Sequence, residues 1–265
     1  MTAVVVVRGI GDVGSAVAHR LFQAGYRVWI SDDPAPAAPR RGMSFTDAAF
    51  DGSAELEGVT ATVYDDLSSV AEALENRRGI PVFLGDLHQA LRIVRPGVLV
   101  DARMRKRVQP EPQMQLAPFT VGLGPNFEAG VETSVVVETQ WGDDLGKVLT
   151  HGRTKELAGE PRNYGGHGRE RFIYAPAGGV FHTKRRIADK VEPGEVVACI
   201  DGVELKAPLA GILRGLVHDG VTVPKTAKVV EVDPRNDPSK VVGIGERPAR
   251  IADGVLEALR MSFRR

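Results

Sequence analysis

Short apolar runs alternate with amphipathic segments through the first 150 residues. The run VVVV at residues 4–7 predicts a strand buried on both faces, and residues 15–24 carry apolar side chains at helical spacing before a glycine. Further strands are predicted at 26–31, 58–64, 80–83 and 98–102, and a second helix at 67–79. This alternation is typical of a Rossmann-like, doubly wound parallel sheet, which we expect to form an α/β domain over residues 1–150.

The pattern changes beyond residue 118 and again beyond residue 168. The stretches FTVGLGPNF (119–127) and SVVVET (134–139) predict a strand, a turn and a returning strand. Residues 151–168 are rich in Gly, Arg and His, which leaves a linker and an active-site lid as alternatives. Residues 246–265 carry apolar side chains at helical spacing and predict a C-terminal helix.

Residues 169–245 consist of short β-rich pieces separated by glycines, with a near repeat in APAGGVF and APLAGIL. This pattern resembles the barrel-sandwich hybrid fold of biotinyl and lipoyl domains, so we expect a small β domain of that kind. Carrier domains present a modifiable lysine at an exposed hairpin tip. Here the tip is Asp201-Gly202, and Lys206 lies directly before Ala207-Pro208, so we do not expect a carrier role.

Composition narrows the class of protein. Lys plus Arg and Asp plus Glu each number 34, so the formal net charge is zero, which argues against a general binder of nucleic acid or membrane surfaces. A single cysteine, Cys199, excludes an internal disulfide framework and suits a reducing compartment. The VVVV run is too short for a signal peptide, and no apolar segment approaches the roughly 18 residues that cross a bilayer. We therefore expect a soluble cytoplasmic protein with no nucleic-acid or membrane partner.

The turn after the first predicted strand carries a complete G-x-G-x-x-G spacing at Gly9, Gly11 and Gly14. Between a strand and a helix this spacing predicts a dinucleotide-binding turn, in which the second glycine lets a pyrophosphate approach the backbone. Asp32 ends the second strand and would accept hydrogen bonds from a ribose diol and repel a 2′-phosphate, which favours NAD over NADP. The alternative is that the turn is structural and holds no ligand.

Other charged residues follow predicted strands at the same sheet edge. Arg40, in the proline-rich loop at 32–42, is either solvated or a clamp for a phosphate or an acidic substrate. Asp101 ends the strand at 98–102, with Arg103 and Lys106 close behind, and this group could bind phosphate or serve as acid and base. A charge cluster exposed to water is the alternative. The six histidines are scattered without ligand spacing, so we expect no metal site.

Together these segments resemble the accessory and maturation proteins of selenium-dependent molybdenum hydroxylase systems, specifically a YqeB-like C-terminal module. In that family the module stands alone or follows a domain of the xanthine dehydrogenase accessory type. The resemblance rests on motifs in order along nearly the whole chain, among them VVVVRGIGDVGSAVAHRLFQAGYRVWISD, VLVDARMRKR, FTVGLGPNFEAG, ERFIYAPAGGVF and APLAGILRGLVHDG. It implies a role in maturing or inserting the molybdenum cofactor of a xanthine-dehydrogenase-like hydroxylase.

Several site residues follow from this resemblance. The family pattern is matched by the glycine turn, by Asp32, by Asp101 and Lys106, and by the GLGP turn with Gly122 and Gly124. Two segments depart from it, ELAGEP at 156–161 and GERPARIAD at 245–253, and these departures allow a different client hydroxylase.

Three functions remain open from the sequence. In the first, a cofactor-maturation protein binds NAD(H) or the dinucleotide form of molybdopterin and docks a hydroxylase subunit. The second is an NAD-dependent oxidoreductase acting on a small acidic substrate, with Asp101 and Lys106 as catalytic candidates. The third is a scaffold that binds a hydroxylase subunit and no nucleotide. Whether the chain is an enzyme, and whether it forms a homo-oligomer, are left open.

Overall fold

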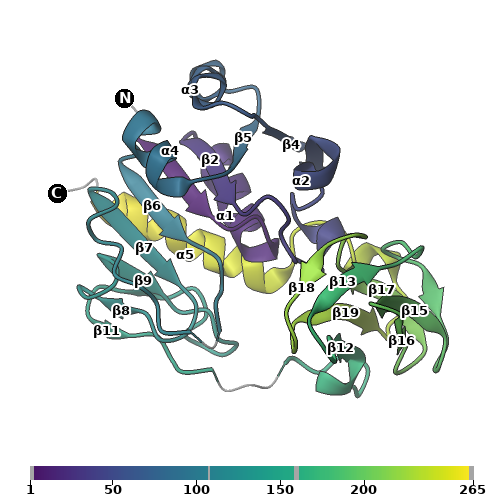
Figure 1. Ribbon diagram of the computed structural model, residues 1–265. Helices are drawn as coiled ribbons and strands as arrows, with labels where there is room; N and C mark the ends of the chain where they lie inside the picture. Colours follow the sequence, from purple (N-terminus) through teal and green to yellow (C-terminus); the bar gives the residue numbers. More distant parts are fainter. Residues whose placement is uncertain (1–2, 107, 158–160, 263–265) are drawn as a thin grey trace.

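The valines at the start of the chain form a central strand of a large sheet in the computed structural model, which describes residues 3–106, 108–157 and 161–262 (Figure 1). This strand, β1 (Val4–Arg8), pairs in parallel with β2 (Arg27–Asp32) and β6 (Val98–Asp101). Val5 and Val7 belong to one apolar cluster and Val6 to another, because successive side chains of a strand point to opposite faces. The prediction of a strand buried on both faces is confirmed.

Seven parallel strands make up most of this sheet. Its order in the described residues is β10 (Val148–Leu149), β9 (Val135–Val137), β7 (Phe119–Leu123), β6, β1, β2, β5 (Ile80–Leu84), β4 (Val59–Val63) and β3 (Ser53–Leu56). The two edge strands run antiparallel to their neighbours, β3 against β4 and β10 against β9. The sheet is therefore mixed.

Helices cover the two faces of the sheet unequally. Helix α1 (Asp12–Gln23) follows β1, and the long α5 (Glu246–Ser262) packs beside α1 and against β7, β9 and β10. On the opposite face, α3 (Leu67–Asn76) and α4 (Leu87–Val94) cover Trp29 and its neighbours. A short helix, α2 (Ala48–Asp51), precedes the β3–β4 hairpin. The helices predicted after β1 and at 67–79 are confirmed, and α4 was not predicted.

The second half of the molecule contains two four-stranded antiparallel sheets within the described residues. One has the order β12 (Phe172–Tyr174), β19 (Lys228–Asp233), β17 (Gly211–Leu216) and β14 (Lys190–Val191). The other has the order β16 (Val203–Lys206), β15 (Val196–Ile200), β13 (Gly179–His182) and β18 (Thr222–Val223). The repeated Ala-Pro segments precede β13 and β17, which belong to different sheets.

The predicted fold class, a Rossmann-like doubly wound parallel sheet followed by a barrel-sandwich-hybrid-like domain, is wrong. The strand–turn–helix–strand unit of β1, α1 and β2 forms as predicted. The sheet built around it, however, is large and mixed, and few helices cover it. Apolar runs reveal that a strand is buried but not the direction of its neighbour. The β3–β4 hairpin, turned at Glu57-Gly58 with positive φ at both residues, was also missed.

Three further expectations meet different outcomes. The strand after the GLGP turn does not return, because β9 runs parallel to β7. The tight turn at Asp201-Gly202 joins β15 to β16, as predicted. Part of the segment predicted as a linker or lid, β11 (Gly152–Arg153), pairs with β8 (Glu128–Ala129). Residues 158–160 and 263–265, which include part of ELAGEP and the end of the expected C-terminal helix, lie outside the described residues.

Candidate functional site

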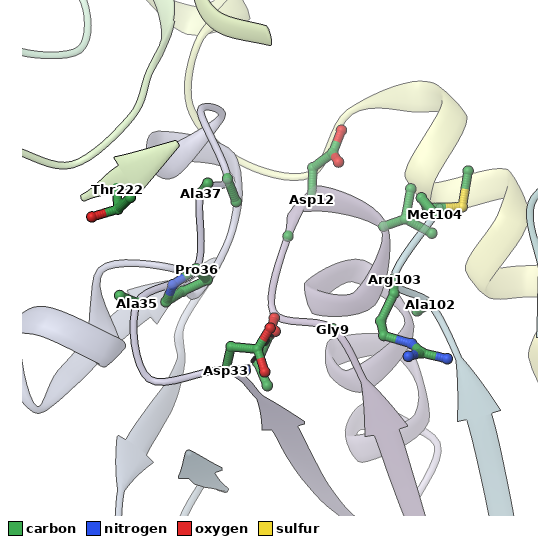
Figure 2. Close-up of a pocket in the computed structure, with 14 residues that line it drawn as sticks. Gly9, Asp12, Asp33, Ala35, Pro36, Ala37, Ala102, Arg103, Met104 and Thr222 are labelled. Carbon is green, nitrogen blue, oxygen red and sulfur yellow. Dashed lines mark hydrogen bonds between the residues drawn. The ribbon is translucent and has the colours of Figure 1, made fainter. Parts of the chain in front are cut away.

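A pocket of about 450 Å³ opens over the glycine turn, at the carboxyl ends of β1, β2 and β6 (Figure 2). The turn itself lies between two walls. One wall is the loop that follows β2, and the other is the loop that follows β6; Thr222 of β18 reaches the pocket from the second half of the molecule. The lining residues are Gly9, Gly11, Asp12, Val13, Asp32, Asp33, Ala35, Pro36, Ala37, Ala38, Ala102, Arg103, Met104 and Thr222. Its volume falls within the usual range for small-molecule sites.

Glycine is present at the three positions of the turn for different structural reasons. Gly9 has φ of +110°, and a Cβ there would lie 3.0 Å from the carbonyl oxygen of Ala102. A Cβ on Gly14 would lie 1.8 Å from the carbonyl oxygen of Gly9, so only glycine lets α1 start against the turn. Gly11 is different, because a Cβ there would meet nothing closer than Ala38, at 3.8 Å. The fold does not require glycine at this position, and the open space lies in the pocket.

The start of α1 supplies backbone donors to this open space. Gly11 is the N-cap residue and offers no side-chain cap, so the first N–H groups of the helix lack the partners that a capping side chain provides. The positive end of the helix dipole lies at the same place and favours an anion. Asp12, in the first turn, is neutralised by Arg40, whose Nη1 lies 2.8 Å from its carboxylate. Burial acts to raise the pKa of Asp12, but Arg40 outweighs it and holds the pKa below its ordinary value.

Asp32 stands at the end of β2 and faces the same pocket. Its carboxylate accepts from the backbone N–H of Ile10 at 2.6 Å and from that of Asp33 at 2.8 Å. Burial raises the pKa of Asp32, and the two backbone donors oppose that shift. Each carboxylate oxygen keeps lone-pair capacity after these bonds, so Asp32 can accept further hydrogen bonds from a hydroxyl pair.

Asp101, a predicted catalytic residue, is buried beneath the pocket wall. It accepts from the backbone N–H and the Nε of Arg103, at 3.1 and 3.0 Å, and from the Gln113 amide at 2.6 Å. Burial acts to raise its pKa, but the hydrogen bonds and charge of Arg103, with the charge of Arg8, hold the pKa below its ordinary value. Asp101 thus lies inside a network that fixes the loop after β6, and it does not line the pocket.

Lys106, the second predicted catalytic residue, lies further along the same loop and is exposed. In the described part of the chain it has no hydrogen bond and no ion pair. Desolvation by the surrounding protein lowers the pKa of Lys106, and the positive charges of Arg247 and Arg40 lower it further. Lys106 does not line the pocket, and the negative charge of Asp12, which does line it, opposes the lowering of the Lys106 pKa.

The other predicted cofactor residues are distributed differently. Gly14 and Arg40 adjoin the pocket without lining it. A Cβ on Gly122 would collide with the Phe127 ring, and Gly124 has φ of +118°, so the backbone of β7 and its loop accounts for these two glycines. Sequence reasoning gave no site role to Asp12, which lies within the glycine motif, to Asp33, which follows Asp32, or to the loop at 35–38. It also missed Thr222, which lies about 200 residues from the turn and gives no local signal.

The described residues contain no group of three or more His, Cys, Asp or Glu side chains placed to hold a metal ion. Cys199, the single cysteine, is partly exposed in β15. Among the same residues no helix has both the length and the apolar character to cross a membrane.

The chain is similar in sequence to the protein YqeB of Escherichia coli strain K12, which is named only as uncharacterized. The two are 39% identical over 259 residues, which is 97% of this chain. The chain spans about half the length of that relative, 47% of it. The similarity extends over nearly the whole of this chain. No family model matches the sequence.

Solved structures give only distant likenesses. The ectoine utilization protein EutE (DoeB) of Ruegeria pomeroyi aligns with a TM-score of 0.26 and 13% identity, covering 88% of this chain and 85% of that one. An aspartoacylase family protein of Mesorhizobium loti gives 0.27 and 13% over the same shares. A succinylglutamate desuccinylase of a Silicibacter species gives 0.25 and 10%, over 87% and 84%. Scores this low establish neither a shared fold nor a shared activity.

These neighbours are aspartoacylase- and desuccinylase-type proteins, and the sheet is mixed. The mixed sheet corrects the label Rossmann, and none of the neighbours named here carries the labels NAD-binding or molybdenum hydroxylase accessory, which were expected from the sequence. The comparisons support a similarity in sequence to YqeB.

Proposed function

We propose that this YqeB-like chain takes part in maturing or inserting the molybdenum cofactor of a xanthine-dehydrogenase-like hydroxylase. In this proposal it binds the dinucleotide form of molybdopterin at the Gly9–Gly14 turn. One observation carries the binding proposal: Gly11, where the fold itself does not require glycine, leaves open space beside uncapped N–H groups at the start of α1. That arrangement suits a pyrophosphate.

Each pocket element has a part in this proposal. The first N–H groups of α1 bind the pyrophosphate, and the Asp12 carboxylate does not repel it because Arg40 neutralises the acid. Asp32 accepts hydrogen bonds from a ribose diol. The alanine-rich loop at 35–38 and Thr222 cover the nucleoside side of the pocket. The bound cofactor would supply the molybdenum chemistry of the client enzyme, whereas this chain would hold and transfer it.

The maturation role rests on the resemblance to accessory proteins of selenium-dependent molybdenum hydroxylase systems. The relative YqeB is named only as uncharacterized, so it supports the similarity to YqeB and adds neither a reaction nor a link to a hydroxylase. A hydroxylase subunit is the proposed partner.

Cofactor retention in cells tests this function. Tagged wild-type chain, purified from cells that express a purine hydroxylase, is expected to retain pterin, measured by fluorescence after oxidation. Gly11→Ala should lower the pterin content at least tenfold, because its methyl group occupies the open space. Gly97→Ala is the matched control, since a Cβ there meets its nearest neighbour at a similar distance, 3.6 Å, away from the pocket.

Pterin content that is absent from wild type, or equal in wild type and Gly11→Ala, would contradict the proposal. Retention of NADH instead would support the second expectation from the sequence, an oxidoreductase acting on a small acidic substrate. Recovery of a hydroxylase subunit without pterin or NADH would support the scaffold.

A further inference from the structure

Three arginines converge on one carboxylate beside the pocket wall that is formed by the loop after β6. Glu111 accepts from Nη2 of Arg103 at 2.6 Å and from Nη1 of Arg8 at 3.3 Å, and its second oxygen accepts from Nη2 of Arg105. Arg103 also lines the pocket over the glycine turn (Figure 2). The carboxylate and its three guanidiniums therefore adjoin the pocket, on the wall that faces the loop after β2.

Buried partners hold two of these arginines from the side of the protein. Arg8 donates to the side-chain oxygen of Gln113 at 2.6 Å, and Arg103 donates its Nε to Asp101 at 3.0 Å. Gln113 and Asp101 are both buried, whereas 42% of the Glu111 side chain is exposed. Because the buried partners fix the guanidiniums, these donors stay in place when the Glu111 carboxylate leaves. Glu111 itself is open to exchange with a solute.

The charges at this wall favour an anion stronger than a carboxylate. Arg8, Arg103 and Arg105 share the two carboxylates of Asp101 and Glu111. An oxyanion with two negative charges would balance the three guanidiniums better than the single charge of Glu111 does. Its oxygens also match the N–H groups that several guanidinium forks present together.

We propose that Arg8, Arg103 and Arg105 form a second anion subsite of the pocket, which the Glu111 carboxylate occupies until a ligand displaces it. The subsite takes an oxyanion or metal-oxo group that carries at least two negative charges. The identity of the bound anion rests on the function proposed above. There the pyrophosphate lies at the start of α1 and the nucleoside lies against the loop after β2. The other half of the dinucleotide, with its anionic molybdenum-bearing end, then faces the three arginines.

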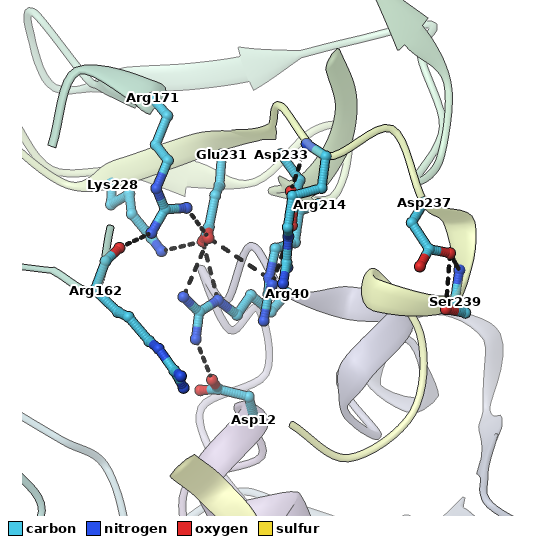
Figure 3. A network of polar contacts seen from close by, with 11 residues as sticks. Asp12, Arg40, Arg162, Arg171, Arg214, Lys228, Glu231, Asp233, Asp237 and Ser239 are labelled. Carbon is cyan, nitrogen blue, oxygen red and sulfur yellow. Dashed lines mark hydrogen bonds and ion pairs between the residues drawn. The ribbon is translucent and has the colours of Figure 1, made fainter. Parts of the chain in front are cut away.

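The arginine network around Glu231 in β19 does not offer such a subsite. Glu231 is fully buried and accepts from Nη1 of Arg171 at 2.6 Å, from Nε of Arg40 at 2.9 Å and from Nζ of Lys228 at 2.7 Å (Figure 3). A solute reaches this carboxylate only if the surrounding strands separate, so its role is structural. Exposure to solvent is the property that makes Glu111 exchangeable.

Calorimetric titration of the full chain with molybdate, at pH 7 and constant ionic strength, tests the subsite. A carboxylate tethered beside the arginines competes with the probe. Glu111→Gln is therefore expected to bind molybdate at least tenfold more tightly than wild type, which corresponds to about 1.4 kcal/mol. Misfolding does not produce a gain in affinity. Glu195→Gln is the matched control, because Glu195 is similarly exposed and pairs with Arg185 in the second half of the molecule.

A second substitution locates the gain. Adding Arg105→Met to Glu111→Gln should reverse it, because one of the three guanidiniums is then missing. Equal affinity of wild type and Glu111→Gln for molybdate, or no binding by either, would overturn the subsite. So would an equal gain in Glu195→Gln, or a gain that survives the loss of Arg105.

Two comparisons separate this subsite from the proposed function. Gly11→Ala alters the turn and not the arginines, so the gain in molybdate affinity should persist when it is combined with Glu111→Gln. That gain, together with no binding of molybdopterin dinucleotide, would contradict the proposed function alone and leave a subsite for a free oxyanion. Dinucleotide binding that is lost in Gly11→Ala but is no tighter in Glu111→Gln would contradict the subsite alone.

Discussion

Arg40 donates two hydrogen bonds to Glu231, at 2.9 and 3.2 Å, although the two residues lie 191 positions apart in the chain. A third bond from the same guanidinium reaches Asp12 at the start of α1. Arg40 thus joins the first turn of the helix to strand β19 of the second half of the molecule. Because the loop at 33–40 ends at this residue, the same contacts position one wall of the pocket.

Replacing Glu231 should destabilise the protein strongly. Glu231→Gln leaves the buried cations Arg40 and Arg171 without their shared carboxylate, and breaking a buried ion pair from one side typically costs about 3–5 kcal/mol. Urea unfolding measures the loss. Glu204→Gln, which breaks an exposed pair with Lys206, should cost less than about 1 kcal/mol. Similar losses in the two variants would contradict the role given to Glu231.

Substitution by alanine should destabilise the protein to very different extents at two glycines of the turn. Gly14→Ala places a methyl group against the carbonyl of Gly9 and should cost more than about 3 kcal/mol or prevent folding. Gly11→Ala meets only open space and should cost no more than about 1 kcal/mol, the usual effect of a poorer N-cap. Thermal or urea unfolding of both variants provides the comparison. Comparable destabilisation would show that Gly11, too, is required by the fold.

Lys228 should make stability depend on alkaline pH. Burial lowers its pKa from 10.5 to about 8, although the Glu231 charge opposes the shift. The unfolded chain therefore binds more protons than the folded chain between pH 8 and 10.5, and the Lys228 contribution to stability rises with pH across that window, by up to about 3 kcal/mol.

Lys228→Met removes this titration, so the stability difference between wild type and variant should shift in favour of wild type from pH 8 to 10.5. Urea unfolding at several pH values, in buffers without phosphate, measures it. A difference that stays constant, or that shifts in favour of the variant, would contradict the assignment.

Replacement of Asp101 should destabilise the protein, whereas replacement of Lys106 should leave its stability nearly unchanged. Asp101→Asn weakens the buried charge-assisted bonds from Arg103 and should cost about 1–3 kcal/mol. Lys106→Met should change stability by less than about 0.5 kcal/mol, because the residue is exposed and has no described partner. If Lys106→Met proved the more destabilising in urea unfolding, the placement of these two residues would be wrong.

Local features of the fold could be predicted because their signals act over few residues. Four valines in a row and three spaced glycines were sufficient to predict β1, the turn and α1. Asp32 was found because it ends the next strand. The same reasoning did not predict the edge strands β3 and β10 and gave the wrong direction for β9, because an apolar run does not reveal the orientation of its partner.

Only the part of the site that depends on local sequence signals could be predicted. Gly9, Gly11 and Asp32 line the pocket, as expected, whereas Asp101 and Arg40 are engaged by neighbouring charges. Nothing near Arg40 in the sequence indicates that Glu231 will accept its hydrogen bonds. Thr222 is likewise brought to the pocket only by the packing of the second half of the molecule against the first.

The most direct measurement is a calorimetric titration of the purified chain with molybdopterin dinucleotide released from a hydroxylase, with NADH as a second dinucleotide that shares the pyrophosphate. The proposed function predicts micromolar binding of the molybdopterin dinucleotide by wild type and by Gly97→Ala, weakened at least tenfold in Gly11→Ala. No binding by wild type, or equal binding by wild type and Gly11→Ala, would contradict the claim that the turn holds this cofactor.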